Sequence, residues 1–260
     1  MTGMMAIKGL GQLRQHVPDL NTLLGVLRYL LLSIILLFLT TVLFTSMPLT
    51  WTFGHLVAEI VLVGLGFGLL YLFFRLKKGF KARFGPLAYS KAGRRFGLPG
   101  VTIIAAVIAH IRYLPGPQIP HFWGYIVLPV LGWVLITVGT LLSLRTVLTF
   151  GVDNLTMLYV YFPEESHLVN HKIYTILRHP AYAALQLIAF GLALLKGNWF
   201  ALACALIFSL GLWGWVRLVE ENELIGRFGP TYLDYRKRVP AFWPRLHDLR
   251  GFFGFLIVGR

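Results

Sequence analysis

The sequence predicts an all-α, polytopic integral membrane protein, and three observations support this fold class. Hydrophobic residues make up 57% of the chain and charged residues only 13%, about half the charged fraction of an average soluble domain. The mean hydropathy is +0.72. Several apolar segments approach the roughly 20 residues that a helix needs to cross a bilayer. A long polar stretch precedes the first of them, which is unlike a signal peptide.

Six spans are expected, and the first two lie before a basic loop. Residues 23–44 form the first span, and Arg28, one turn inside it, can extend back to the lipid headgroups. Residues 56–74 form the second. Glu59 stands near the start of this span, and we expect its carboxyl group to lie at the outer interface and reach water. The loop at residues 75–98 is dense in Lys and Arg.

The third and fourth spans are separated by a rigid turn. Residues 101–111 are a short apolar run, predicted to be a tilted or broken helix, or one extended by its flanks. The sequence PGPQIP at residues 115–120 predicts a turn. Residues 122–144 form the fourth span, and the mixed segment 145–178 follows.

The last two spans are predicted to form a tight helical hairpin. Residues 181–195 and 199–216 are apolar, and only the tripeptide KGN lies between them. The tail from residue 217 onward is charged and aromatic. Its apolar end, GFFGFLIV, is too short to cross the bilayer and is expected to lie on the interface.

The formal net charge of +14 reflects basic clusters that flank the apolar runs. This pattern is typical of membrane orientation, so we expect no nucleic-acid partner. If the loop at 75–98 is cytoplasmic, six spans place both termini and the segment 145–178 on that side. Only Arg112 and Lys196 then remain outside, and the positive-inside rule predicts cytoplasmic termini.

Two charged motifs face the membrane surface at the ends of the last two spans. Arg178 and His179 precede Pro180, which fits the first turn of a helix, where free N–H groups favour an anion. Alternatively, the two basic side chains merely cap the interface. Glu220 and Glu221 follow the sixth span directly. They either bind a ligand's ammonium or hydroxyl groups or pair with Arg residues at helical spacing.

The sequence gives no basis for a metal centre. The single cysteine, Cys204, lies inside an apolar run, so neither a disulfide nor a Cys-based metal site is expected. His167 and His171 stand four residues apart and could share one helical face. Because no third ligand accompanies them, we predict no metal.

Residues 166–246 resemble the C-terminal half of the isoprenylcysteine carboxyl methyltransferase family, which is related to the phospholipid N-methyltransferases. The likeness rests on HLVNHKIYTILRHPAYAAL, the hydrophobic hairpin, and EENELIGRFGPTYLDYRKRVPAFWP. The family's motifs occur in order: LV, Tyr174, RHP with Tyr182, the Glu pair, FG, Tyr232, Tyr235, RV and Pro240. Lys172, Ile173 and Ala184 depart from it, the upstream His is displaced by one position, and residues 1–165 show no matching motif.

The resemblance implies a membrane enzyme that uses S-adenosylmethionine. It implies that the cofactor pocket is shaped by Leu168, Val169, Tyr174, His179, Pro180, Tyr182, Glu220 and Glu221. It also implies catalytic basic positions at the cofactor and substrate end, Arg178 and Arg238. We therefore divide the chain into an N-terminal transmembrane region, residues 1–150, and a methyltransferase region, residues 151–260.

The expected reaction is methyl transfer to a lipophilic acceptor that enters from the bilayer, surrounded by membrane lipids. It is most like carboxyl O-methylation of isoprenylcysteine, and a phospholipid or a small thiol is the alternative acceptor. In this hypothesis the cofactor's methionyl carboxylate lies at Arg178 and His179, and Glu220 or Glu221 takes its ammonium or ribose group. The sequence is also compatible with an NADPH-dependent enzyme like the sterol reductases, or with a non-catalytic membrane protein.

Overall fold

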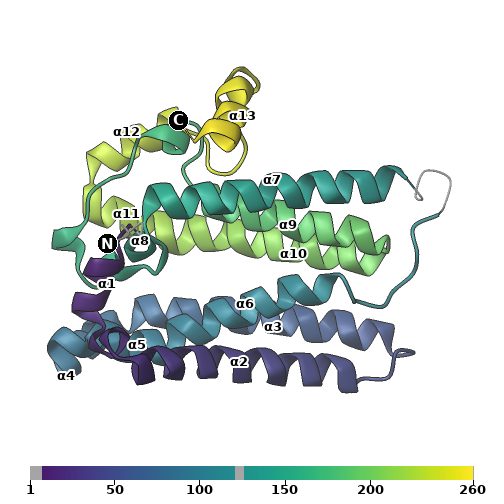
Figure 1. Ribbon diagram of the computed structural model, residues 1–260, viewed down its shortest axis with the longest axis horizontal. Coiled ribbons are helices and arrows are strands. Elements are labelled where there is room, and N and C mark those ends of the chain that lie inside the picture. The colour runs from purple at the N-terminus through teal and green to yellow at the C-terminus, as the bar shows by residue number, and fades with distance from the viewer. Residues whose placement is uncertain (1–7, 121–125, 260) are drawn as a thin grey trace, which may run out of the picture.

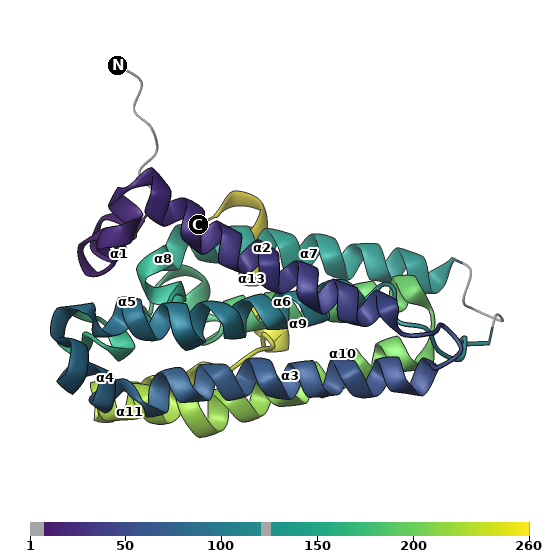
Figure 2. The ribbon, with the colours of Figure 1, turned by 90° about the horizontal axis from the view of Figure 1, so that it is seen from below.

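The computed structural model describes residues 8–120 and 126–259, and its long helices lie in two layers (Figure 1). One layer contains α2 (Leu23–Ser46), α3 (Thr52–Arg75) and α6 (Leu98–Ile111). The other contains α7 (Val127–Phe150), α9 (Pro180–Lys196) and α10 (Trp199–Trp215). The layers meet where α3 contacts α10 and α6 contacts α9. Figure 2 shows α2 lying obliquely to α3.

The helices of the described residues account for all six predicted spans. Five are long and apolar enough to cross a membrane: Leu23–Ser46, Thr52–Arg75, Lys77–Ile111, Val127–Phe150 and Trp199–Phe228. The sixth, α9, is apolar but has only 17 residues. The predicted all-α, polytopic membrane fold is therefore confirmed. The start of the predicted fourth span, residues 122–125, lies outside the described residues.

The short third span turns out to be the end of a longer helical segment. The longer segment is Lys77–Ile111. It begins in the basic loop with α4 (Lys77–Phe84) and α5 (Ala88–Ala92) and continues through the π-helix η3 (Gly93–Gly97) into α6. This agrees with the expectation that its flanks extend the run. Hydropathy alone could not reveal the extension, because the flanks are basic.

Glycines let α7 and α9 approach closely. A Cβ added at Gly139 of α7 would lie 2.9 Å from the carbonyl oxygen of Ala184 on α9. A Cβ at Gly132 would lie 2.9 Å from the carbonyl oxygen of Gly191. Lipid tails are as apolar as side chains, so membrane helices associate largely through such close packing. The α7–α9 pair is therefore held by backbone contact.

The hairpin between α9 and α10 is fixed by one amide side chain. Asn198 is fully buried and caps α10, because its Oδ1 accepts a hydrogen bond from the Ala201 N–H at 2.7 Å. Its Nδ2 donates to the Leu114 carbonyl at 2.8 Å. Gly197 adopts the left-handed conformation, φ +69°, which ends α9. The KGN hairpin prediction is confirmed.

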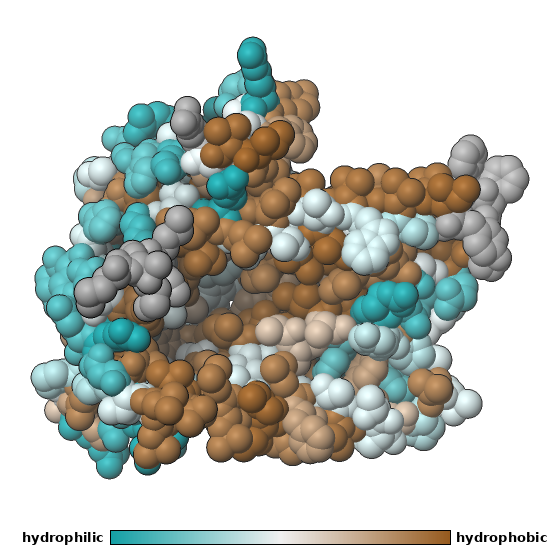
Figure 3. Space-filling model, viewed as in Figure 1, coloured by the Kyte–Doolittle hydropathy of each residue, from teal (hydrophilic) through white to brown (hydrophobic). Residues whose placement is uncertain are grey.

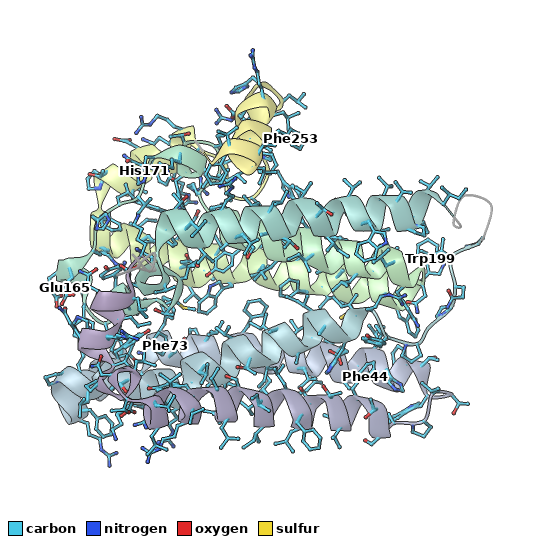
Figure 4. The ribbon with its side chains drawn as sticks, viewed as in Figure 1. Phe44, Phe73, Glu165, His171, Trp199 and Phe253 are labelled. Carbon is cyan, nitrogen blue, oxygen red and sulfur yellow. The ribbon has the colours of Figure 1, made fainter. Side chains whose placement is uncertain are left out.

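Polar residues gather at one end of the two layers, which we call the polar end. The short helices found there are α1 (Leu10–His16), α4, α5, α8 (Val152–Leu155), α11 (Glu221–Phe228) and α12 (Pro230–Arg238). Figure 3 shows hydrophilic residues over this end and hydrophobic ones along the long helices. Figure 4 places Glu165 and His171 at the polar end, and Phe44 and Trp199 at the opposite, far end.

The apolar tail helix α13 (Leu249–Val258) packs against α7. The side chain of Arg145 holds it in place, donating to the carbonyl of Leu256 at 3.2 Å and to that of Ile257 at 2.8 Å. Phe252 and Phe255 are buried. The tail therefore forms a helix, as a segment lying along a membrane interface would.

The expectation for Glu59 is wrong. Its side chain is fully buried rather than in contact with water. Its Oε1 lies 2.9 Å from Nδ1 of His110 on α6, and Thr41 of α2 lies 3.2 Å from the other ring nitrogen. The acid and the histidine are 51 residues apart in the chain, so no local pattern indicated that they pair.

Candidate active site

A cavity of about 320 Å³ lies between the two layers and reaches the polar end. Figure 3 shows a hollow between the layers near this end. Its apolar arm runs between the long helices and is lined by side chains such as Phe67, Leu70, Ile104, Leu185 and Leu212. Its polar end is lined by residues of α9, α11, α12 and the loop after α8. The cavity therefore draws its walls from both halves of the chain.

The structure brings most of the predicted site residues to this cavity. The lining contains Arg178 and seven of the predicted cofactor residues: Leu168, Val169, Tyr174, His179, Pro180, Tyr182 and Glu220. Glu221 and Arg238 are not part of the lining. The RHP motif and the Glu-Glu motif, which are about forty residues apart in the sequence, therefore lie together at the cavity. Of the two predicted basic residues only Arg178 lines it, and of the two glutamates only Glu220.

The rim formed by Arg178 and His179 is fixed by the C-terminal tail. The Arg178 N–H donates to the Pro240 carbonyl at 2.9 Å, and the His179 N–H donates to the Ala241 carbonyl at 3.0 Å. Pro180 then begins α9, where its missing N–H costs no hydrogen bond. The tail thus holds the RHP sequence at the cavity.

Glu221 lies behind the cavity wall and ties three segments together. Arg178 Nη2 donates to its Oε1 at 2.5 Å, and Arg236 Nε lies 3.2 Å from its Oε2. Arg178 Nη1 also donates to the carbonyls of Arg236 and Val239, at 2.7 and 2.6 Å. Glu221 is only 2% exposed. Since both its oxygens face basic groups of the protein, it positions Arg178 and α12.

Glu220 is the carboxylate that faces the cavity. Its Oε2 accepts hydrogen bonds from the Tyr182 hydroxyl at 2.6 Å and from Trp215 Nε1 at 3.2 Å. Its Oε1 lies 3.5 Å from Nδ1 of His179. Glu220 ends the π-helix η7 (Val216–Glu220), which joins α10 to α11. Single π-turns are frequent at functional sites, since they redirect side chains within a helix.

The two glutamates beside His179 favour its protonated form. Burial by itself lowers the pKa of His179, but the carboxylates of Glu220 and Glu221 outweigh it and raise the pKa above 6.5. Its Nε2 lies 3.6 Å from Glu221 Oε1. A protonated imidazole cannot accept a proton. His179 is therefore poised to hold negative charge in place rather than to act as a base.

Arg236, rather than Arg238, is the basic residue of α12 that contacts Glu221, and neither arginine lines the cavity. Arg238 is exposed, and its Nε donates to the Asp234 carbonyl of its own helix at 3.3 Å. Tyr232 and Tyr235 of α12 are buried, as is Val239 directly after the helix. Arg236 stands at helical spacing from Tyr232, so the periodicity of the tail could have identified it.

Glu223 and Arg227 of α11 also line the cavity, although neither was predicted as a site residue. Lys77 Nζ donates to Glu223 Oε2 at 2.6 Å, which joins the start of α4 to α11. Arg227 Nη2 lies 3.6 Å from Glu223 Oε1. The basic loop of the N-terminal half therefore contacts the cavity rim directly.

Several buried polar atoms of the cavity residues have no hydrogen-bond partner among the residues that the structure describes. They are Thr146 Oγ1, Arg178 Nε, His179 Nε2, Arg227 Nε and the Tyr232 hydroxyl. All five can donate a hydrogen. Buried polar groups are normally hydrogen-bonded, so this cavity fits a ligand with several acceptor oxygens. Residues 8–120 and 126–259 contain no group of three metal-ligating side chains.

Taken together, these features define a polytopic membrane protein with a donor-lined pocket at the polar ends of its helices. Residues 127–231 match the family model described as phospholipid methyltransferase. This matched segment begins in α7 and ends in α12. It therefore includes every element that contributes Arg178, His179 and the paired glutamates.

Three curated relatives illustrate the similarity. Protein-S-isoprenylcysteine O-methyltransferase B of Arabidopsis thaliana is 26% identical over 154 residues, 58% of this chain and 74% of the relative. The enzyme of Schizosaccharomyces pombe is 39% identical over 80 residues, 30% of this chain and 33% of its own. The Xenopus laevis protein is 31% identical over 127 residues, which are 47% of this chain and 43% of the relative. No solved structure matches the chain significantly.

These matches confirm the predicted resemblance. The second half of the chain is similar to the phospholipid methyltransferases and to the isoprenylcysteine O-methyltransferases.

Proposed function

We propose that this protein transfers a methyl group from S-adenosylmethionine to the carboxylate of a lipophilic, prenylcysteine-type acceptor. One observation carries the proposal: a single cavity joins a polar end lined by hydrogen-bond donors to an apolar arm between the helix layers. A water-soluble donor and a lipid acceptor can meet in such a cavity. Alignment of the two and exclusion of water supply most of the catalysis that a methyl transfer requires.

The residues of the polar end fit the proposed cofactor. S-adenosylmethionine would supply an electrophilic methyl group on a sulfonium, together with a carboxylate, an ammonium and ribose hydroxyls. The donors Arg178 Nε and the Tyr232 hydroxyl are buried without partners among the described residues and suit a carboxylate. Glu220 suits the ammonium or the ribose. Leu168 and Val169 give the apolar part of the wall.

Glu220, rather than Glu221, is proposed as the cofactor-binding acid. Both oxygens of Glu221 face arginines, and Glu221 is buried and does not line the cavity. Glu220 lines the cavity and is oriented by Tyr182 and Trp215. Arg178, with two nitrogens already bonded to the protein, contributes mainly by fixing the rim.

The charge state of His179 favours a carboxylate acceptor. Methyl transfer to a carboxylate forms the C–O bond as the C–S bond breaks, the sulfur keeps the bonding electron pair, and no proton moves. A terminal carboxyl group, with a pKa of about 3.3 to 3.7, is already ionised at neutral pH. An ammonium or thiol acceptor would need a base, and the neighbouring glutamates favour the protonated form of His179, which cannot accept a proton. A phospholipid amine or a small thiol is therefore the second candidate.

The acceptor is proposed to enter from the bilayer through the apolar arm. Val101 of α6 lines the arm and is also 48% exposed at the surface of the helix layer. The basic clusters support an arrangement in which the polar end faces the cytoplasm, with both termini on that side.

Calorimetric titration of the purified protein tests the proposal against the reductase and scaffold hypotheses. Binding of S-adenosylhomocysteine is expected, whereas a reductase would bind NADPH and a scaffold would bind neither. Labelled methyl transfer to a panel of prenylcysteine, aminophospholipid and thiol acceptors then identifies the acceptor. Transfer only to the amines would refute the carboxylate proposal.

Replacing Glu220 by Gln tests the cofactor assignment. The change removes a charged acceptor, so we expect the dissociation constant of S-adenosylhomocysteine to rise about 10-fold to 100-fold. Glu164→Gln is the matched control, since Glu164 is exposed and outside the cavity. An unchanged dissociation constant in the Glu220 variant would count against this role.

A further inference from the structure

Thr146 of α7 carries an unusual hydroxyl group. The residue is fully buried, and its Oγ1 has no hydrogen-bond partner among the described residues. A threonine in a helix commonly bonds to a carbonyl one turn earlier. Thr40 of α2 does so, donating to the Leu36 and Leu37 carbonyls at 3.0 and 2.9 Å. The Thr146 hydroxyl is thus left free for a ligand.

The register of α7 and α9 shows the level of Thr146 along this helix pair. The helices run antiparallel, and Gly132 meets Gly191 while Gly139 meets Ala184. The two contacts are separated by the same number of residues on both helices. One further step of that length leads from Gly139 to Thr146 on α7. On the other side of the pair it leads from Ala184 to Leu177, the residue before Arg178. Thr146 therefore lies level with the rim of the cavity.

Its neighbours on α7 place Thr146 at the border between the two parts of the cavity. Phe150, one turn nearer the polar end, packs against Tyr174 with ring centroids 4.9 Å apart. Ser143 and Val147 line the cavity beside Thr146. A lipid-like ligand with its apolar chain in the arm of the cavity would therefore place the start of its polar head next to Thr146.

We infer that the Thr146 hydroxyl binds the carboxylate of the lipophilic acceptor, an inference that rests on the function proposed above. The hydroxyl donates to one carboxylate oxygen and leaves the other to attack the methyl carbon. It thereby selects acceptors whose head is an anion at the rim over those that end in an ester or a hydrocarbon. The substrate class is a lipid-linked carboxylate.

The test compares Thr146→Val, which removes the hydroxyl and keeps the shape, with Thr146→Ser, which keeps the hydroxyl. In methyl transfer to a prenylcysteine carboxylate, the Val variant is expected to raise the acceptor KM about tenfold. The Ser variant is expected to retain the original KM. The dissociation constant of S-adenosylhomocysteine should not change in either. Thr40→Val, which removes a locally satisfied hydroxyl, should alter none of these values.

Three results would overturn the assignment: an unchanged acceptor KM in the Val variant, a loss confined to S-adenosylhomocysteine binding, or a Ser variant as impaired as Val. Direct calorimetry of the prenylcysteine carboxylate and its methyl ester, with S-adenosylhomocysteine present, needs no turnover. The Val variant should weaken binding of the carboxylate more than that of the ester. This measurement separates failure of the Thr146 assignment from absence of methyl transfer in the wild-type protein.

Discussion

Two buried clusters of acidic and basic groups occupy opposite ends of the molecule. At the polar end, Glu220 and Glu221 meet Arg178 and His179, and the tail fixes their backbone. At the far end, Glu59 meets His110 between α3 and α6. Both clusters place a carboxylate inside a membrane protein, where ionisable groups usually mark function.

Only the polar-end cluster adjoins the cavity. Glu220 and His179 line it, whereas Glu59 and His110 do not. The rings of Phe44 and His110 stack with centroids 4.7 Å apart, which closes the far cluster on one side. A buried acid therefore indicates a ligand site in this protein only where unsatisfied donors and an open space accompany it. The far cluster is better explained as a link between helices.

The largest expected effect is that of Arg178→Ala. It leaves the buried Glu221 carboxylate with one partner fewer, and breaking a buried ion pair on one side costs about 3–5 kcal/mol. We expect a lower unfolding temperature in detergent and loss of S-adenosylhomocysteine binding. The double variant with Glu221→Ala should be less destabilised than the sum of the two single variants. Simple additivity would mean that the two residues are not coupled.

Glu59→Gln should separate stability from binding. Gln replaces the carboxylate whose Oε1 lies 2.9 Å from the His110 ring, so the free energy of unfolding should fall by about 1–3 kcal/mol. S-adenosylhomocysteine affinity, measured by calorimetry below the unfolding temperature, should match that of the wild type. A weakened affinity would show that the far cluster communicates with the site.

The pH dependence of the free energy of unfolding should reveal the charge on His179 in the polar-end cluster. The pKa of His179 is raised above 6.5 in the folded protein, because its carboxylate partners outweigh burial. Its contribution is therefore complete below pH 6.5 and declines as the pH rises through the folded pKa. The stability difference between wild type and His179→Gln should be largest near pH 6 and shrink towards pH 9. If the stability difference between wild type and His179→Gln stayed constant across this pH range, His179 would not contribute to stability through its positive charge.

The smallest effect is expected from Arg238→Ala, at most about 0.5 kcal/mol in unfolding free energy, because Arg238 is exposed. Arg236→Ala removes a contact to Glu221 and should lower both stability and cofactor affinity more than Arg238→Ala does. Thermal unfolding and calorimetry on the two variants rank them. A larger effect of Arg238→Ala than of Arg236→Ala would show that Arg238 contributes to the site.

The sequence allowed the spans and most of the pocket to be predicted, because both depend on local patterns. Apolar runs of bilayer length located the helices, and the RHP and Glu-Glu motifs identified residues that the fold brings together. Thr146 and the Glu59–His110 pair could not be found in this way. Their roles depend on which helices meet and in which register, and a single sequence contains little information on either.

The π-turn at Val216–Glu220 has a consequence for how this protein can change. A π-turn contains one residue more than the α-helical turn it replaces, yet the chain rotates by nearly the same angle in passing through it. Deleting one residue there would therefore leave α11 close to its present orientation and would change mainly which side chains the turn itself presents. Because Glu220 is the last residue of that turn, a single deletion would alter the carboxylate that faces the cavity while the helices on either side keep their packing.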